Sequence, residues 1–74
     1  MPYVTLGKSS TYFVEFYVFD KNSKQCGTLL YFYSLQGDYT KKSGIIPQEI
    51  EEDMENIKGL ANAILLANSK EKGR

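Results

Sequence analysis

One run of nine residues, Thr11 to Phe19 (TYFVEFYVF), constrains the fold of this chain most. Nearly all of its residues are aromatic or β-branched, which favours a β-strand. Because side chains alternate between the two faces of a strand, the even positions form one apolar face and the odd positions form a second, interrupted only by Glu15. Such a strand needs a packing partner on each side of its sheet, or else it leaves an apolar face in water.

Two further strands and a loop are predicted around this run. Tyr3–Leu6 and Thr28–Leu35 are rich in β-branched and aromatic residues, and polar turn residues separate both from the central strand. The segment Gln36–Gly44 carries two glycines and two adjacent lysines, a composition that indicates a loop.

The last part of the chain has the periodicity of one amphipathic helix that begins near Pro47. Proline fits the first turn of a helix, because the N–H that it lacks has no partner there. Spacings of three and four residues mark the inward face of this helix, Ile50, Met54, Ile57, Ala61, Ile64 and Asn68. Gly59 costs helix stability, so we expect it to allow a close contact with a bulky strand side chain, with a kink as the alternative. Residues 69–74 are expected to fray.

These elements predict one α+β domain over residues 1–74, a three-stranded antiparallel sheet followed by a long C-terminal helix (βββα). A chain of 74 residues buries about three fifths of its surface, enough for one core and no second domain. One helix covers only one face of the sheet. We expect it on the face of Val14, Phe16 and Val18, because that face carries no charge.

The second face of the sheet would then expose aromatic and aliphatic side chains. An exposed apolar patch of several hundred Å² is large for a monomer and usually marks an interface. The pattern therefore predicts a homodimer, joined sheet to sheet or through edge strands, unless loops and lysine methylenes cover part of this face. The residues assigned to the self-association face are Phe13, Tyr17, Phe19, Leu29, Tyr31 and Tyr33.

The composition argues against catalysis and against bound metals or cofactors. The absence of histidine excludes Ser-His and Cys-His nucleophile pairs, and a single cysteine excludes zinc sites of the CxxC kind. No glycine-rich phosphate loop and no spaced carboxylate pair in an apolar setting is present. We therefore expect no catalytic, cofactor-binding or metal-binding residues, and a protein that is not an enzyme.

The apolar segments and the cysteine predict a cytoplasmic protein without a membrane anchor. The first residues lack the basic and apolar regions of a signal peptide. The longest apolar helical stretch, Leu60–Ala67, is far shorter than the roughly 20 residues that a membrane span needs. Cys26 is most simply a reduced thiol.

The densest charge feature lies at the start of the predicted helix. Five of the seven residues from Glu49 to Glu55 are acidic, and no basic residue lies between Lys42 and Lys58. One interpretation is a solvated helix start that complements the helix dipole. The other is a negative surface that binds a basic protein surface, present twice in a dimer. The partner-binding residues of this second hypothesis are Glu49, Glu51, Glu52, Asp53 and Glu55.

Two alternatives to protein binding stay open. Lys41 and Lys42 precede the helix, and the βββα order superficially resembles a double-stranded-RNA-binding domain, although that family places its lysines where this chain has acids. A tyrosine-rich sheet can also stack single-stranded bases, but Glu15 and a net charge of zero weigh against nucleic acid as the partner. The remaining alternative is a structural homo-oligomeric scaffold.

In its small size, its many tyrosines and the acidic run Glu49–Glu55, the chain resembles the host-takeover proteins that bacteriophages encode, among them the inhibitors of the bacterial DNA sliding clamp. Many clamp partners carry a Gln-Leu-x-Leu-Phe peptide, and neither Gln48-Glu49-Ile50 nor Ser34-Leu35-Gln36 matches it. The resemblance therefore implies a non-enzymatic DNA mimic in the host cytoplasm, an acidic dimer that meets the basic DNA channel of the clamp and blocks DNA access.

Overall fold

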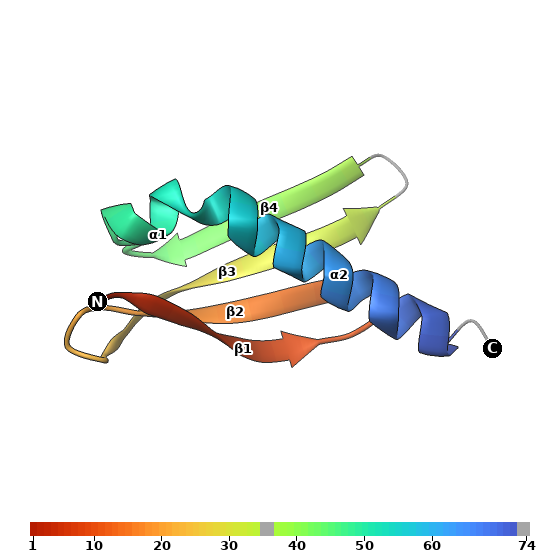
Figure 1. Cartoon of the computed structure of the whole chain (residues 1–74), viewed down its shortest axis with the longest axis horizontal. Coiled ribbons are helices and arrows are strands. Elements are labelled where there is room, and N and C mark those ends of the chain that lie inside the picture. The colour runs from red at the N-terminus through yellow and green to blue at the C-terminus, as the bar shows by residue number, and fades with distance from the viewer. Residues whose placement is uncertain (35–36, 73–74) are drawn as a thin grey trace.

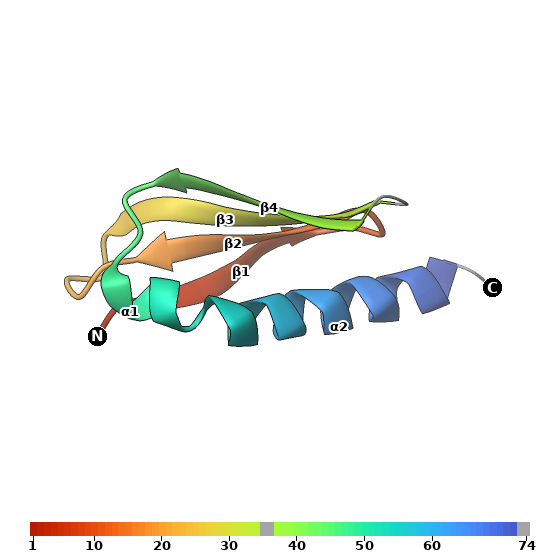
Figure 2. The same ribbon diagram turned by 90° about the horizontal axis from the view of Figure 1, so that it is seen from above.

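The computed structural model describes residues 1–34 and 37–72. Within these residues, four strands form one antiparallel sheet in chain order, and two helices follow. The strands are β1 (Tyr3–Ser9), β2 (Phe13–Phe19), β3 (Gln25–Ser34) and β4 (Gly37–Gly44), and the helices are α1 (Gln48–Glu52) and α2 (Met54–Lys72). Both helices lie across the same face of the sheet, and the opposite face is left open by the described part of the chain (Figures 1 and 2). No helix among the described residues is long and apolar enough to cross a membrane.

The α+β class and the sheet-then-helix order are confirmed, but the sheet has four strands instead of three. The prediction of a loop is wrong for residues 37–44, which form β4, while residues 35 and 36 lie outside the described part of the chain. β4 pairs with β3 along its whole length, including the pairs Leu30 with Lys41 and Tyr31 with Thr40. An edge strand tolerates polar residues, and lysines at an edge discourage pairing with other chains. The composition that suggested a loop therefore suits an edge strand.

The core lies between the helices and the covered face of the sheet. Val14, Phe16 and Val18 are buried there, as predicted from the absence of charge on that face. The inward helix face is also confirmed, because Ile50, Ile57 and Ala61 are buried and Met54 and Ile64 pack against the core as partly buried residues. Leu65, one residue beyond this stripe, is buried as well.

β3 contributes Leu29 and Tyr31 to this core, which corrects their assignment to the self-association face. Residues directly opposite each other in an antiparallel pair share a face, and Leu29 pairs with Phe16 while Tyr31 pairs with Val14. Leu29 is fully buried and Tyr31 is 3% exposed. The alternation along each strand was predictable, but the register between the strands was not. The side chain of Tyr33 lies outside the described part of the chain.

The helical layer is interrupted at Asp53 and not at Gly59. The N–H of Asp53 donates to the carbonyl oxygen of Ile50 at 3.0 Å, and α2 begins at the next residue. Gly59 is exposed, and a Cβ added to it meets nothing within 4 Å, so the expected close contact with a strand is wrong. The helical backbone continues to Lys72, and the fraying of residues 69–74 stays a prediction.

A tight contact between two glycines marks the end of the sheet from which the chain leaves for the helices. Gly44 pairs with Gly27 and has a φ of 80°, a conformation that favours glycine. A Cβ on Gly44 would clash with the carbonyl oxygen of Cys26, and one on Gly27 would lie 2.5 Å from the carbonyl oxygen of Ser43. Only glycine fits at either position.

Candidate functional site

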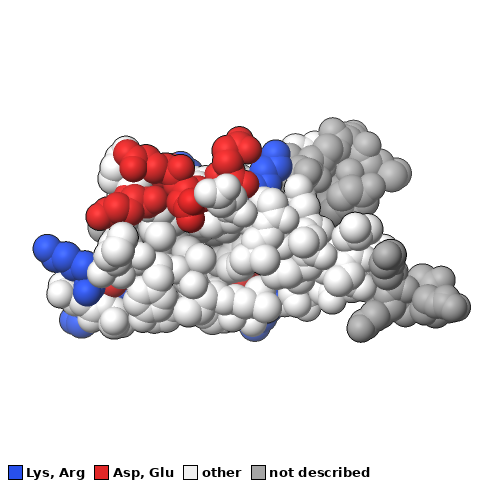
Figure 3. Space-filling model, in the orientation of Figure 1, with Lys and Arg blue, Asp and Glu red and all other residues white. Residues whose placement is uncertain are grey.

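An acidic surface covers α1 and the first turn of α2 (Figure 3). We define the acidic surface as the five residues predicted to bind a partner, Glu49, Glu51, Glu52, Asp53 and Glu55. Four of them are exposed, and Glu51 is half-buried. The structure thus brings all five predicted residues to one end of the helical layer, on both sides of the break at Asp53.

Three of these carboxylates have side-chain partners. Lys42 of β4 donates to both oxygens of Glu51, at 2.9 Å to Oε2 and 3.2 Å to Oε1. The carboxylate of Glu52 accepts a hydrogen bond from the uncharged side-chain amide of Gln48 at 3.2 Å. The carboxylate of Asp53 accepts one from the side-chain amide of Asn56 at 2.7 Å.

Glu49 and Glu55, by contrast, have no side-chain partner among the described residues. Among the side chains that the structure describes, the ion pair with Lys42 offsets one of the five charges of the acidic surface. The surface therefore remains strongly negative, although the chain as a whole has a formal charge of zero.

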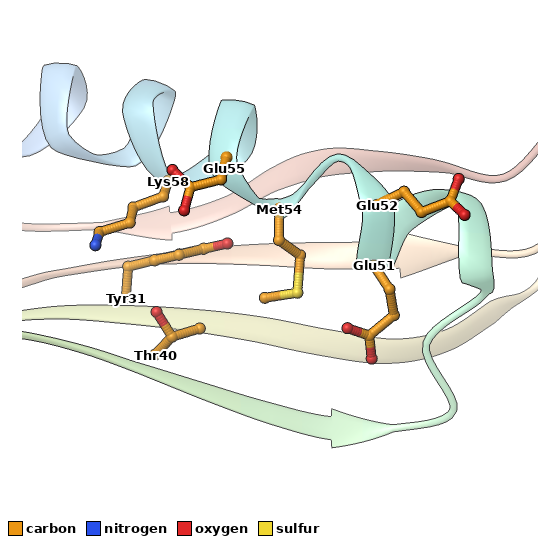
Figure 4. A pocket seen from close by; sticks show the side chains of 7 residues that line it. All are labelled: Tyr31, Thr40, Glu51, Glu52, Met54, Glu55 and Lys58. Carbon is orange, nitrogen blue, oxygen red and sulfur yellow. The ribbon is translucent and has the colours of Figure 1, made fainter.

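A pocket of about 330 Å³ lies between the acidic surface and the β4 side of the sheet (Figure 4). Its strand side is formed by Tyr31 and Thr40, which are register partners in β3 and β4. Its helix side is formed by Glu51, Glu52, Met54, Glu55 and Lys58. Sequence reasoning missed this pocket, because it placed Tyr31 on the opposite face and took residues 37–44 for a loop.

The hydroxyl of Tyr31 is the unusual group in this pocket. It is buried and has no hydrogen-bond partner among the described residues, whereas the ring packs edge-to-face on Phe16 with centroids 5.9 Å apart. Burial also raises the pKa of Tyr31 above its ordinary value of 10.0. A buried hydroxyl without a partner costs about 1–3 kcal/mol. The core therefore holds a neutral phenol whose hydrogen-bonding capacity is unused.

The lysines of the nucleic-acid alternative point to opposite faces of the sheet, because adjacent residues in a strand alternate. Lys42 lies opposite Leu29 on the covered face, where it reaches Glu51. Lys41 lies opposite Leu30 and shares the open face with it. The two lysines therefore do not form a paired basic site.

The open face carries three of the predicted self-association residues together with three aromatic residues that were not predicted. Phe13, Tyr17 and Phe19 are half-buried there. Tyr3 stacks on Phe19 with ring centroids 5.1 Å apart and planes 7° from parallel. Phe32 and Tyr39 complete a row across the strands with Phe13. Tyr3, Phe32 and Tyr39 are 40%, 36% and 49% exposed, so this face presents aromatic side chains to solvent.

The described residues include no group of three or more Cys, Asp and Glu side chains placed to hold a metal ion. The thiol of Cys26 is free and half-buried, with its Sγ 3.6 Å from the carbonyl oxygen of Val18.

No protein family, curated protein or solved structure matches the chain.

Proposed function

We propose that this protein is a non-enzymatic protein-binding module whose acidic surface binds a basic surface on a partner protein. The observation that supports this proposal is the clustering of five carboxylates at one end of the helical layer, of which one is paired with a cation among the described residues. A charged surface of this kind attracts a basic partner and orients it during encounter.

The pocket beside the acidic surface also favours a partner-binding surface over the alternative interpretation, in which the acidic residues only solvate the start of the helix. A solvated helix face needs no cavity, whereas binding surfaces combine an apolar centre with a polar rim. Here Met54 and the ring of Tyr31 adjoin the carboxylates of Glu51 and Glu55. The negative charge thus borders the helix side of a partly apolar recess into which a side chain of a partner fits.

The test is capture of partner proteins from bacterial lysate by two variants that change the net charge equally. The first neutralises the acidic surface (Glu49→Gln, Glu52→Gln and Asp53→Asn) and keeps Glu51, which pairs with Lys42. The control adds three lysines at exposed positions elsewhere (Asn22→Lys, Gln25→Lys and Asn62→Lys). A genuine partner is retained by the control and lost by the first variant. Equal retention by both variants contradicts the proposal.

The bacterial DNA sliding clamp is the first individual target to test, and this choice rests on the resemblance to phage inhibitors alone. Purified clamp should bind the immobilised protein in a salt-dependent manner, because the attraction is electrostatic. Excess duplex DNA should compete for the clamp channel. Binding that is unaffected by DNA would contradict the blocking of DNA access.

We also propose that the open face joins two copies of the chain. The exposed rings of Tyr3 and Phe32 support this proposal, since they lie on the face of the sheet opposite the helices. Light scattering should give twice 8.4 kDa, and Phe32→Lys should give the monomer mass. A monomer at low micromolar concentration contradicts the homodimer. A dimer that captures no other protein favours the scaffold alternative.

One observation favours the single-stranded nucleic-acid alternative. Lys41 shares the open face with the aromatic row of Phe13, Phe32 and Tyr39, and such a face is able to stack bases beside a phosphate contact. This alternative predicts a gel shift with a single-stranded oligonucleotide that Lys41→Ala weakens. Lys42→Ala is the matched control, because Lys42 lies on the other face. No shift at moderate salt excludes this function.

A further inference from the structure

We propose that the pocket beside the acidic surface receives one arginine side chain of the partner, with its guanidinium among Glu55, Thr40 and Tyr31. This inference rests on the proposed function, because it names the group through which a basic partner is anchored.

The charge of the pocket selects a cation. Its lining includes three carboxylates and one ammonium group, from Lys58. Glu51 is paired with Lys42, and Glu52 turns away from the pocket toward Gln48. Glu55 keeps a carboxylate with no partner among the described residues, and Figure 4 shows its side chain beside that of Lys58 on the helix side, across the pocket from the ring of Tyr31. One positive group from outside complements this arrangement.

The buried hydroxyl of Tyr31 is the second, independent sign of a ligand. It lies in a residue that is 3% exposed, and it has no partner in the described part of the chain. In Figure 4 the ring lies along the strand side of the pocket, and its hydroxyl end is directed toward Met54. A donor that reaches this oxygen recovers the cost of leaving it unpaired.

The directions of the acceptors favour guanidinium over ammonium. Glu55 belongs to α2, above the pocket, whereas Tyr31 and Thr40 belong to adjacent strands below it. A guanidinium carries five N–H donors that point outward in one plane, so it is able to reach acceptors on several sides. An ammonium carries three donors on one atom and satisfies a narrower set.

The apolar groups suit the rest of the side chain. The ring of Tyr31 and the thioether of Met54 offer a surface for the three methylenes of arginine. Met54 is half-buried, and its flexible side chain is able to move aside and uncover the hydroxyl. A volume of about 330 Å³ is at the lower end of the range for ligand pockets and is ample for one side chain.

The experiment is an NMR titration of the ¹⁵N-labelled protein with N-acetylarginine methylamide. Saturable shifts are expected at the amides of Thr40, Glu55 and Lys58. N-acetylcitrulline methylamide, which has nearly the same shape without the charge, should produce none. The lysine analogue should bind more weakly than the arginine probe. Equal shifts with citrulline, or no saturable shift with arginine, would overturn the proposal, and equal binding of lysine would overturn the choice of arginine.

Two variants with matched controls locate the binding. Tyr31→Phe and Glu55→Gln should each weaken arginine binding about tenfold, since each removes a hydrogen bond to a charged group. The controls are Tyr17→Phe and Glu15→Gln, both on the open face and outside the pocket, and both should bind arginine as the wild type does. Tyr31→Phe should keep the wild-type spectrum, because the lost hydroxyl has no partner in the described residues. Equal affinity of a variant and its control overturns the assignment.

The two proposals fail separately. A partner that depends on the acidic surface but is captured equally well by Tyr31→Phe, combined with no arginine shifts, overturns the pocket and leaves the proposed function standing. Arginine binding in the pocket, without any partner that distinguishes the two charge variants, overturns the proposed function alone.

Discussion

The side-chain amide of Asn68 donates a hydrogen bond to the carbonyl oxygen of Ser10, 58 residues earlier, with a nitrogen–oxygen distance of 3.1 Å. Ser10 opens the turn between β1 and β2, where its hydroxyl accepts from the N–H groups of Tyr12 and Phe13. The bond therefore ties the C-terminal half of α2 to the opposite end of the chain. It also explains why an asparagine continues the apolar stripe of the helix.

Replacing Asn68 with alanine should lower the free energy of unfolding by about 1 kcal/mol, the usual net contribution of one hydrogen bond. Urea unfolding followed by circular dichroism measures this difference. Asn62→Ala is the control, because Asn62 is exposed on the same helix, and it should change stability by less than about 0.5 kcal/mol. Equal effects of the two substitutions would show that the bond to Ser10 contributes nothing.

Gly7→Ala should destabilise the protein by about 1 kcal/mol, the lower end of the range for overpacking, because the half-buried ring of Tyr17 is able to shift. A Cβ at this position would lie 2.7 Å from Cζ of Tyr17, whose ring covers the glycine. The cost should largely disappear in a Tyr17→Ala background, because the ring is then absent. A double-mutant cycle from urea unfolding tests this coupling. Additive effects would contradict the contact.

Gly59→Ala should stabilise the protein by about 1 kcal/mol. Gly59 is exposed within α2, and an added Cβ meets nothing within 4 Å, so only the difference in helix propensity acts. Thermal unfolding at low protein concentration measures the change. A loss of stability would instead show that this side of α2 is in contact with something.

Stability should fall above about pH 10 partly because of Tyr31. Burial raises the pKa of its folded state above the ordinary 10.0, so the folded protein holds this proton more tightly than the unfolded chain. The contribution is complete below pH 10 and is lost as the pH rises through the folded-state pKa. Tyr31→Phe should lose less stability than the wild type between pH 9 and pH 11 in urea unfolding. Identical losses would contradict the raised pKa.

The side-chain pattern predicts the covered face of β2 and the inward face of the helices, because both follow from local alternation or periodicity. It does not predict how strands pair. Leu29 and Tyr31 were assigned to the open face because their position relative to Phe16 depends on register, a property of two strands together. β4 was missed because an edge strand that carries Lys41 and Lys42 lacks an apolar face.

The candidate site divides in the same way. The five acids of the acidic surface lie within seven residues of one another, so they stay together even though the helix is interrupted at Asp53. The pocket joins Tyr31 and Thr40 to Glu55 and depends on the pairing of β3 with β4 and on the crossing of α2. The only feature of the sequence that points to the pocket is Tyr31, a tyrosine among apolar residues. Its meaning is ambiguous until the register of β3 is known.

The close approach of Gly27 and Gly44 has a consequence for how β4 finds its alignment. The ion pair with Glu51 does not by itself fix the alignment of β4 with β3, because Lys41 and Lys42 are consecutive. If β4 slipped by one residue, Lys41 would take the place of Lys42. The same slip would move Thr40 out of the pocket and turn Tyr39 inward. It would also bring a side chain to the place that Gly44 now occupies, where a Cβ does not fit. Gly27 and Gly44 thus exclude the misaligned sheet. The pocket depends on these two glycines, because it forms only in the correct alignment of β3 and β4.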